Sequence, residues 1–255
     1  LHKTTTGFAN TAVGYQSMQK NIDGTSNVAM GNSAMKLNVS GNQNVAVGNN
    51  ALYLNTTDNN TCVGYNAAYY QTTGANNTVL GRSAFLTNTT GSENTAIGNY
   101  ALDASTVADY NTGVGYLALS NLTTGVRNVA LGRSAGGVMT TGDFNTFLGY
   151  NCRPTAISND YVVAVGYSVE GAAGYTTVGR SSLTIRAAHG TATWAAVSDR
   201  RYKKDIEHST AGLDFVNDLK PRTFNYKNKG DLPTTFKAYE KDSDKVYKES
   251  KTQHG

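Results

Sequence analysis

The sequence has little cysteine, proline, tryptophan or charge. Its 255 residues include two cysteines, three prolines and one tryptophan, and 16% of them are charged. Cys62 and Cys152 lie far apart, so they predict neither a disulfide framework nor a metal site and are typical of small buried side chains. No apolar stretch approaches the ~20 residues that a bilayer-spanning helix needs, so we expect no membrane insertion.

The net charge of +4 is small and spread along the chain. No run of Lys or Arg tracks a groove, and the tyrosines are not interleaved with basic residues as a stacking platform would need, so we expect no nucleic-acid partner. The Gly-Gly-x-Gly-x-Asp runs of calcium-binding repeats are absent as well. We therefore expect neither a metal nor another cofactor.

Glycine, in contrast, is abundant, with 27 copies, and many of these close a short repeat. The motif reads Asn, then Thr or Val, then a variable residue, then Val, Met, Leu or Ile, then Gly. Its closing glycines are 17 residues apart at every step except one of 16. Nine copies begin with asparagine, and a tenth begins with Val162 instead; the nine are at Asn10, Asn27, Asn44, Asn60, Asn77, Asn94, Asn111, Asn128 and Asn145.

The columns of the repeat indicate short strands that stack. The residues one and three positions before the glycine share one face of a strand, and the residue between them, usually Ala, suits a crowded opposite face. The glycine supplies a bend or a close backbone approach. Such a unit buries its apolar face only by stacking on its neighbours, and stacking would align the asparagine amides into a ladder. The sequence therefore predicts a mostly β fold, a parallel β-solenoid of 17-residue coils.

Residues after the closing glycine indicate a core and a surface column. A small residue stands three positions after it, as in Ala34 and Ala84, and a large apolar one usually follows, as in Met35 and Phe85. The residue directly after the glycine is often aromatic or basic. Contact with host glycans, a solvated edge and contact between protomers all remain possible roles for this column, which contains Tyr15, Tyr65, Arg82, Tyr116, Arg133, Tyr150 and Tyr167.

A column of carboxylates lies six positions before the glycine, at Asp58, Asp109, Asp143 and Asp160. A polysaccharide-degrading tailspike would need paired carboxylates that flank a sugar bond. This column falls in a turn, where Asp is favoured for local reasons, so we interpret it as structural.

The repeats of residues 1–166 resemble the head repeats of trimeric autotransporter adhesins and similar repeats in phage tail fibres. The resemblance implies a left-handed parallel β-roll and a homotrimer in which three rolls pack side by side. It also implies a host cell-surface receptor, either a glycan or a protein. We interpret residues 167–197 as a degenerate repeat and neck.

Composition changes abruptly near residue 197. Residues 1–197 contain 17 charged side chains, whereas residues 198–255 contain 23. The runs 196–206 and 212–226 resemble the start of the intramolecular chaperone of viral fibres, a C-terminal auto-processing domain. The residues that match its signature are Ser198, Asp199, Arg201, Lys203, Pro221 and Tyr226.

This second resemblance implies a partial α+β chaperone segment over 198–255, with a helix that includes Leu213, and single-turnover self-cleavage between Val197 and Ser198. A serine hydroxyl needs a base, and a desolvated lysine can serve. Ser198 is then the nucleophile and Lys203 the base, with Lys204 as the rival base. We expect the chain to be a fragment cut at both ends.

These observations predict a viral tail-fibre protein, located in the virion, that binds a receptor and carries a self-cleaving chaperone. The alternatives are a trimeric adhesin of the bacterial cell surface and, less favoured, a polysaccharide-degrading tailspike. An adhesin would need an export signal and a membrane anchor in flanking sequence.

Overall fold

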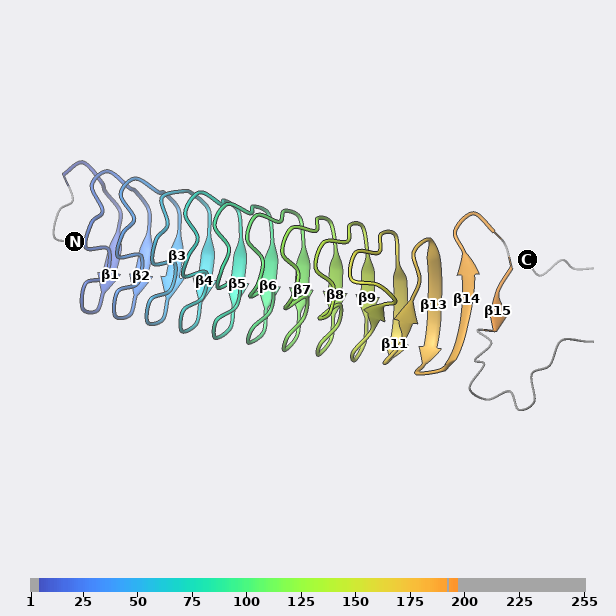
Figure 1. The fold of residues 1–255 in the computed structure, drawn as a ribbon. Coiled ribbons are helices and arrows are strands. Elements are labelled where there is room, and N and C mark those ends of the chain that lie inside the picture. The colour runs from blue at the N-terminus through green and yellow to red at the C-terminus, as the bar shows by residue number, and fades with distance from the viewer. Residues whose placement is uncertain (1–4, 192, 197–255) are drawn as a thin grey trace, which may run out of the picture. The chain divides into compact units, whose positions relative to one another are not determined.

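The computed structural model describes residues 5–191 and 193–196. The chain divides into two units, Leu1–Ser198 and Asp199–Gly255, and the described residues belong to the first. They form an all-β solenoid of about ten coils that advance along one axis (Figure 1). The described residues contain no helix.

Each coil contributes one short strand to a 13-stranded sheet. The three-residue strands are β1 (Thr11–Val13), β2 (Val28–Met30), β3 (Val45–Val47), β4 (Thr61–Val63), β5 (Thr78–Leu80), β6 (Thr95–Ile97), β7 (Thr112–Val114), β8 (Val129–Leu131) and β9 (Thr146–Leu148). The strands that complete this sheet are β11 (Val163–Tyr167), β13 (Tyr175–Arg180), β14 (Leu183–Ala188) and β15 (Ala195–Ala196). A separate two-stranded sheet contains β10 (Arg153–Pro154) and β12 (Glu170–Gly171).

The strands of the large sheet pair in parallel from β1 to β13. Equivalent positions of the repeat stand opposite each other, as with Ala12 and Ala29. The register is kept across the single 16-residue step, where Val45 stands opposite Thr61. Columns of the repeat thus become continuous rows of side chains along the sheet, which confirms the β-solenoid predicted from the sequence.

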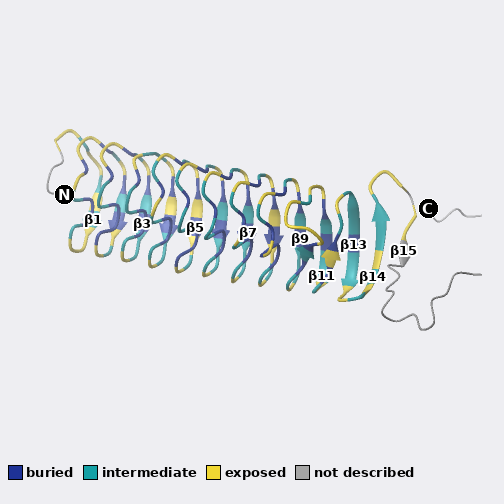
Figure 2. Ribbon diagram, in the orientation of Figure 1, coloured by how far each residue is buried: buried dark blue, intermediate teal, exposed yellow. Residues whose placement is uncertain are grey.

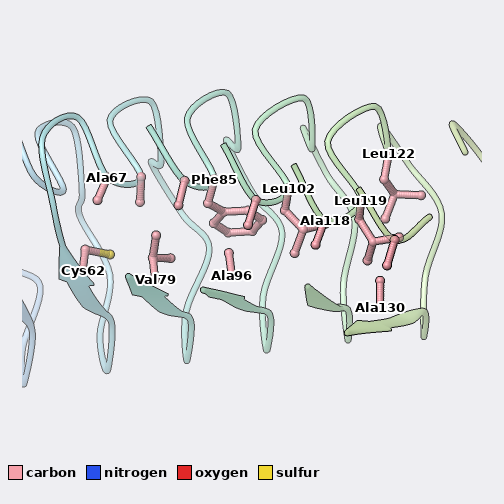
Figure 3. Close-up of a cluster of buried hydrophobic side chains, with 14 of the residues drawn as sticks. Cys62, Ala67, Val79, Phe85, Ala96, Leu102, Ala118, Leu119, Leu122 and Ala130 are labelled. Atoms are coloured by element: carbon pink, nitrogen blue, oxygen red, sulfur yellow. The ribbon is translucent and has the colours of Figure 1, made fainter. Parts of the chain in front are cut away.

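A narrow apolar core lies between the sheet and the segment that follows each closing glycine. The middle residue of each strand from β2 to β9 is buried, and so are most of the residues three and four positions after the glycine (Figure 2). In Figure 3, Val79 and Ala96 on the strands face Phe85 and Leu102 on the opposite segments. The predicted crowded inner face is confirmed. We call the segments opposite the sheet, from the second to the seventh residue after each closing glycine, the facing layer.

The closing glycines combine a positive φ with close backbone approach. Gly98 has φ +127°, and a Cβ at this position would lie 2.5 Å from the carbonyl oxygen of Gly115 in the next coil. The bend and the close approach expected at these glycines are therefore both present. Large core residues of the facing layer also have positive φ, among them Met35, Leu52 and Phe85. This conformation is rare for bulky residues, so packing between adjacent coils must hold it.

Parallel stacking ends at β13. The next strand, β14, pairs with β13 in the antiparallel direction, with Val178 opposite Ile185, and β15 pairs with β14 in the same way. The stretch 167–197, interpreted as a degenerate repeat and neck, therefore contributes one further parallel strand and then two antiparallel ones to the large sheet, and β12 to the small one. The left-handed winding and the trimeric state stay predictions. The expected helix around Leu213 lies outside the described residues.

Candidate functional site

The predicted cleavage site lies outside the described residues. Val197, Ser198 and Lys203 all follow Ala196, the last residue that the structure describes. Their roles, and that of the rival base Lys204, remain predictions. The geometry that can be described belongs to the solenoid that precedes them.

The outer face of the sheet is an apolar surface. In the strands from β1 to β9, the first and third residues point away from the core; the third is always apolar, and the first is Thr or Val. Leu131 is 52% exposed and Leu80 is 48% exposed. These two rows contain no charged residue from β1 to β9. A long row of exposed apolar side chains without charge is typical of an interaction site in soluble proteins.

One edge of this face carries a ladder of aromatic rings and guanidinium groups, which we call the glycine-side ladder. Arg133 lies between two rings, with its Cζ 5.6 Å from the centroid of Tyr116 and 5.5 Å from that of Tyr150. Tyr150 stacks on Tyr167 at 5.0 Å, and Arg180 lies over Tyr167. Most of its members belong to the aromatic and basic column identified in the sequence. Stacking between coils orders these side chains.

The opposite edge carries a second ladder, the asparagine-side ladder, which precedes the repeat asparagines. Arg127 lies 5.1 Å from the ring centroid of Tyr110 and 5.3 Å from that of Phe144. Phe144 stacks on Tyr161 at 5.2 Å. This ladder was not predicted from the sequence, although an aromatic or basic residue precedes the asparagine in three successive copies and Val162 in the next, which was a usable signal.

The carboxylates of the Asp column bind backbone amides. Oδ1 of Asp58 accepts a hydrogen bond from the N–H of Asn42 at 2.7 Å, and Asp109 and Asp143 accept equivalent bonds from Ser92 and Val126. Each bond joins a turn to the same turn of the preceding coil. This geometry agrees with the structural interpretation of the column.

The repeat asparagines form the predicted amide ladder. Oδ1 of Asn94 accepts from the backbone N–H of Asn111 at 2.9 Å and from its Nδ2 at 3.3 Å. Nδ2 of Asn94 donates to Oδ1 of Asn77 at 3.2 Å and to the carbonyl oxygen of Ala108 at 2.8 Å. Asn94 and its equivalents from Asn27 to Asn145 are buried. The ladder therefore satisfies buried polar groups of the backbone that parallel strands leave open.

A second amide column was missed by the sequence analysis. It stands seven positions after the closing glycine, where Asn38 donates to Oδ1 of Asn21 at 3.0 Å and to the carbonyl oxygen of Gly41 at 3.1 Å. Asn55, Gln71 and Asn88 continue it before Ser105, Leu122 and Met139 replace the amides. The signal was weak because only part of the column is asparagine.

Both cysteines are free and buried, as expected. Burial raises the pKa of each thiol. Within the described residues no group of His, Cys, Asp and Glu is placed to hold a metal ion. In the same part of the chain, no helix has the length and hydropathy of a membrane span.

The family comparison concerns the segment that begins where the described solenoid ends. Residues 198–251 match the family model Peptidase_S74, described as chaperone of endosialidase. The C-terminal segment is a chaperone-of-endosialidase domain. Its first matched residue is Ser198, and the matched range includes Lys203. The family predicted from the signature around Ser198 is therefore confirmed for this segment.

The other two comparisons add no relative. No curated protein matches the chain, and no solved structure matches it either. The solenoid is therefore assigned from the geometry of the described residues, and the chaperone-of-endosialidase domain is assigned from the family match.

Proposed function

We propose that the protein is a phage tail-fibre protein whose chaperone-of-endosialidase domain directs trimer folding and then cleaves itself off. The observation that carries the proposal is the match to this domain from Ser198 onward, directly after a repeat-built β-solenoid. The fibre would be part of the virion and would bind a receptor on the host cell.

Self-cleavage needs one nucleophile and one base. Lys203, in its neutral form, accepts the hydroxyl proton of Ser198, and the activated oxygen attacks the carbonyl carbon of Val197. The bond between this carbon and the nitrogen of Ser198 breaks as the nitrogen takes up the proton from Lys203, which leaves Val197 as an ester on the Ser198 oxygen. Water then hydrolyses the ester, so that one fragment ends at Val197 and the other begins at Ser198. Each chain performs this reaction once.

Replacing Ser198 tests the cleavage. The full-length protein, including any residues that follow Gly255 in it, should give two bands on a denaturing gel, and Ser198→Ala should give one. Lys203→Ala should also give one band, because the serine loses its base, whereas Lys204→Ala should still give two. Cleavage of the Ser198→Ala variant would show that Ser198 is not the nucleophile. Loss of cleavage in the Lys204→Ala variant alone would show that Lys204, and not Lys203, is the base.

The outer face of the sheet supports the trimer. An interface core is apolar and poor in charge, and Tyr and Arg are enriched in interfaces. The sheet presents uncharged rows flanked by two ladders of aromatic rings and arginines. Arg127 and Arg133 form no ion pair within the described residues, where Arg153–Glu170 is the salt bridge. We therefore assign this face to contacts between three copies of the chain.

A lysine on this face should dissociate the trimer. Leu131 is 52% exposed in the single chain, so Leu131→Lys should change the stability of one chain little. In the trimer it would bury an unpaired charge in each copy, at a cost of about 3 kcal/mol or more per copy. Light scattering coupled to size-exclusion chromatography should show monomers.

Val138→Lys is the matched control, because Val138 is 41% exposed and lies in the facing layer. It should remain trimeric. A trimeric Leu131→Lys variant would place the interface elsewhere.

A detachable chaperone suits this architecture. Every strand pair of the parallel sheet joins residues about one coil apart, so pairing is non-local, and the growing sheet exposes an unpaired edge until the next coil forms. A segment that brings three chains together first would fix their register. Its removal afterwards would make the assembly difficult to reverse.

A further inference from the structure

The facing layer contains a small pocket between three of its coils. Its volume is about 240 Å³, and it is lined by Asn50, Asn66, Tyr69, Tyr70 and Leu86. Typical ligand pockets occupy roughly 300–1,000 Å³, so this one has room for a single ring-sized group. No charged side chain lines it.

Tyrosine rings form one wall of the pocket. Tyr69 stacks on Tyr53 with a centroid distance of 4.9 Å, and Tyr70 meets Tyr69 edge-on at 4.7 Å. Lys36 lies over the outer side of the Tyr53 ring at 5.7 Å. These contacts fix the orientation of Tyr69, while Tyr70 remains 47% exposed. Burial, together with the neighbouring Tyr53 and Tyr70, raises the pKa of Tyr69.

Two amides supply polar groups to the same pocket. Nδ2 of Asn50 donates to Oδ1 of Asn66 at 3.1 Å. Within the described part of the chain, Oδ1 of Asn50 then has no donor and Nδ2 of Asn66 has no acceptor. A free acceptor therefore lies next to a free donor, beside exposed aromatic surface.

We propose that this pocket binds one neutral pyranose unit of a surface glycan. A pyranose ring presents C–H groups that pack on an aromatic ring, and its hydroxyls both donate and accept hydrogen bonds, which matches the Tyr70 ring and the paired amides. The absence of charge among the lining residues favours a neutral sugar. The inference rests on the proposed function, because it names the receptor class that the fibre would recognise.

The pocket would stay open in the proposed trimer. Tyr69 and Tyr70 belong to the facing layer, which lies across the core from the sheet, as the neighbouring residues Ala67 and Phe85 show in Figure 3. The trimer face assigned above is the outer face of the sheet. The two surfaces therefore do not compete.

Saturation-transfer NMR with the full-length protein tests the site. The probes are the methyl pyranosides of glucose, galactose, mannose and N-acetylglucosamine. At least one should bind, with the strongest transfer to protons on one face of the ring. Tyr70→Ala should weaken that binding about tenfold by removing the ring, and Asn66→Ala should weaken it by removing a donor. Phe8→Ala, which removes an exposed ring outside the pocket and outside both ladders, should bind as the wild type does.

Three results would overturn the site: no pyranoside binds, Tyr70→Ala and Asn66→Ala bind as the wild type does, or an aromatic peptide competes for the pocket and the sugars do not. Melting temperature and oligomeric mass, measured on the same samples, show whether each variant is folded. Failure of the proposed function would appear in the cleavage and light-scattering experiments, which do not depend on sugar binding.

Discussion

Replacing Gly98 with alanine should destabilise the solenoid by about 4 kcal/mol or more, which is exceptional for one methyl group. The new Cβ would lie 2.5 Å from the carbonyl oxygen of Gly115, and this atom belongs to the backbone of the next coil and cannot rotate away. The φ of +127° adds strain that an L-residue tolerates poorly. Chemical denaturation followed by circular dichroism should show the loss.

Gly174→Ala is the control that separates the clash from the backbone strain. Gly174 also has a positive φ, +73°, but a Cβ there would have no atom within 4 Å. Its replacement should cost only about 1 kcal/mol, the usual penalty for alanine in the left-handed region. Equal losses at the two positions would contradict the proposed role of close backbone approach.

Replacing Asn94 with alanine should cost about 3 kcal/mol or more, because two buried backbone groups lose their partners. The N–H of Asn111 donates to Oδ1 of Asn94, and the carbonyl oxygen of Ala108 accepts from its Nδ2. The methyl group of alanine can form neither hydrogen bond. Because each coil contacts only its neighbours, the coils on the two sides of the substituted one should unfold less cooperatively. The unfolding transition should therefore broaden.

Asn49→Ala provides the comparison for the amide ladder. Asn49 is an exposed asparagine on the same solenoid. Its replacement should change stability by no more than about 0.5 kcal/mol. If Asn94→Ala were equally mild, the ladder would be a consequence of the stacking and not a cause of its stability.

The sequence alone was sufficient for the parts of the fold that one column determines. The 17-residue spacing of the closing glycines predicted the length of the coil, and the alternation around Ala96 predicted the inner and outer faces of the strand. The invariant position of Asn94 and its equivalents gave the amide ladder. In each case one residue type recurs in most of the coils, so stacking aligns those residues in a row.

Features that depend on two or more columns could not be read in this way. The positive φ of Leu52 and Phe85 has no signal in residue type, because tertiary packing overrides their backbone preference. The pocket beside Tyr70 needs side chains from three coils, and its shape depends on how those coils are rotated and spaced. The second amide column changes from Asn38 to Leu122 along the chain, so it had no constant signature.

The candidate cleavage site was predicted from a signature that extends well beyond its own two residues. A solvated Lys203 and a turn at Ser198 are what their spacing alone would favour, since these residue types are common on surfaces. The wider signature, through Pro221 and Tyr226, predicted the domain, and the family match over 198–251 supports that identification. Residue roles within the domain depend on geometry that residue types cannot supply.

The 16-residue coil shows where the solenoid tolerates a change of length. Between Gly48 and Gly64 one residue is missing from the corner that follows Asn55, yet Val45 still stands opposite Thr61. The carbonyl oxygen of Thr57 there accepts the hydrogen bond from a repeat asparagine amide that the carbonyl oxygen of Gly41 accepts in the preceding coil. This corner therefore accommodates a change of length without a shift of any strand, which makes it the natural position for variable peptides carried on a constant scaffold.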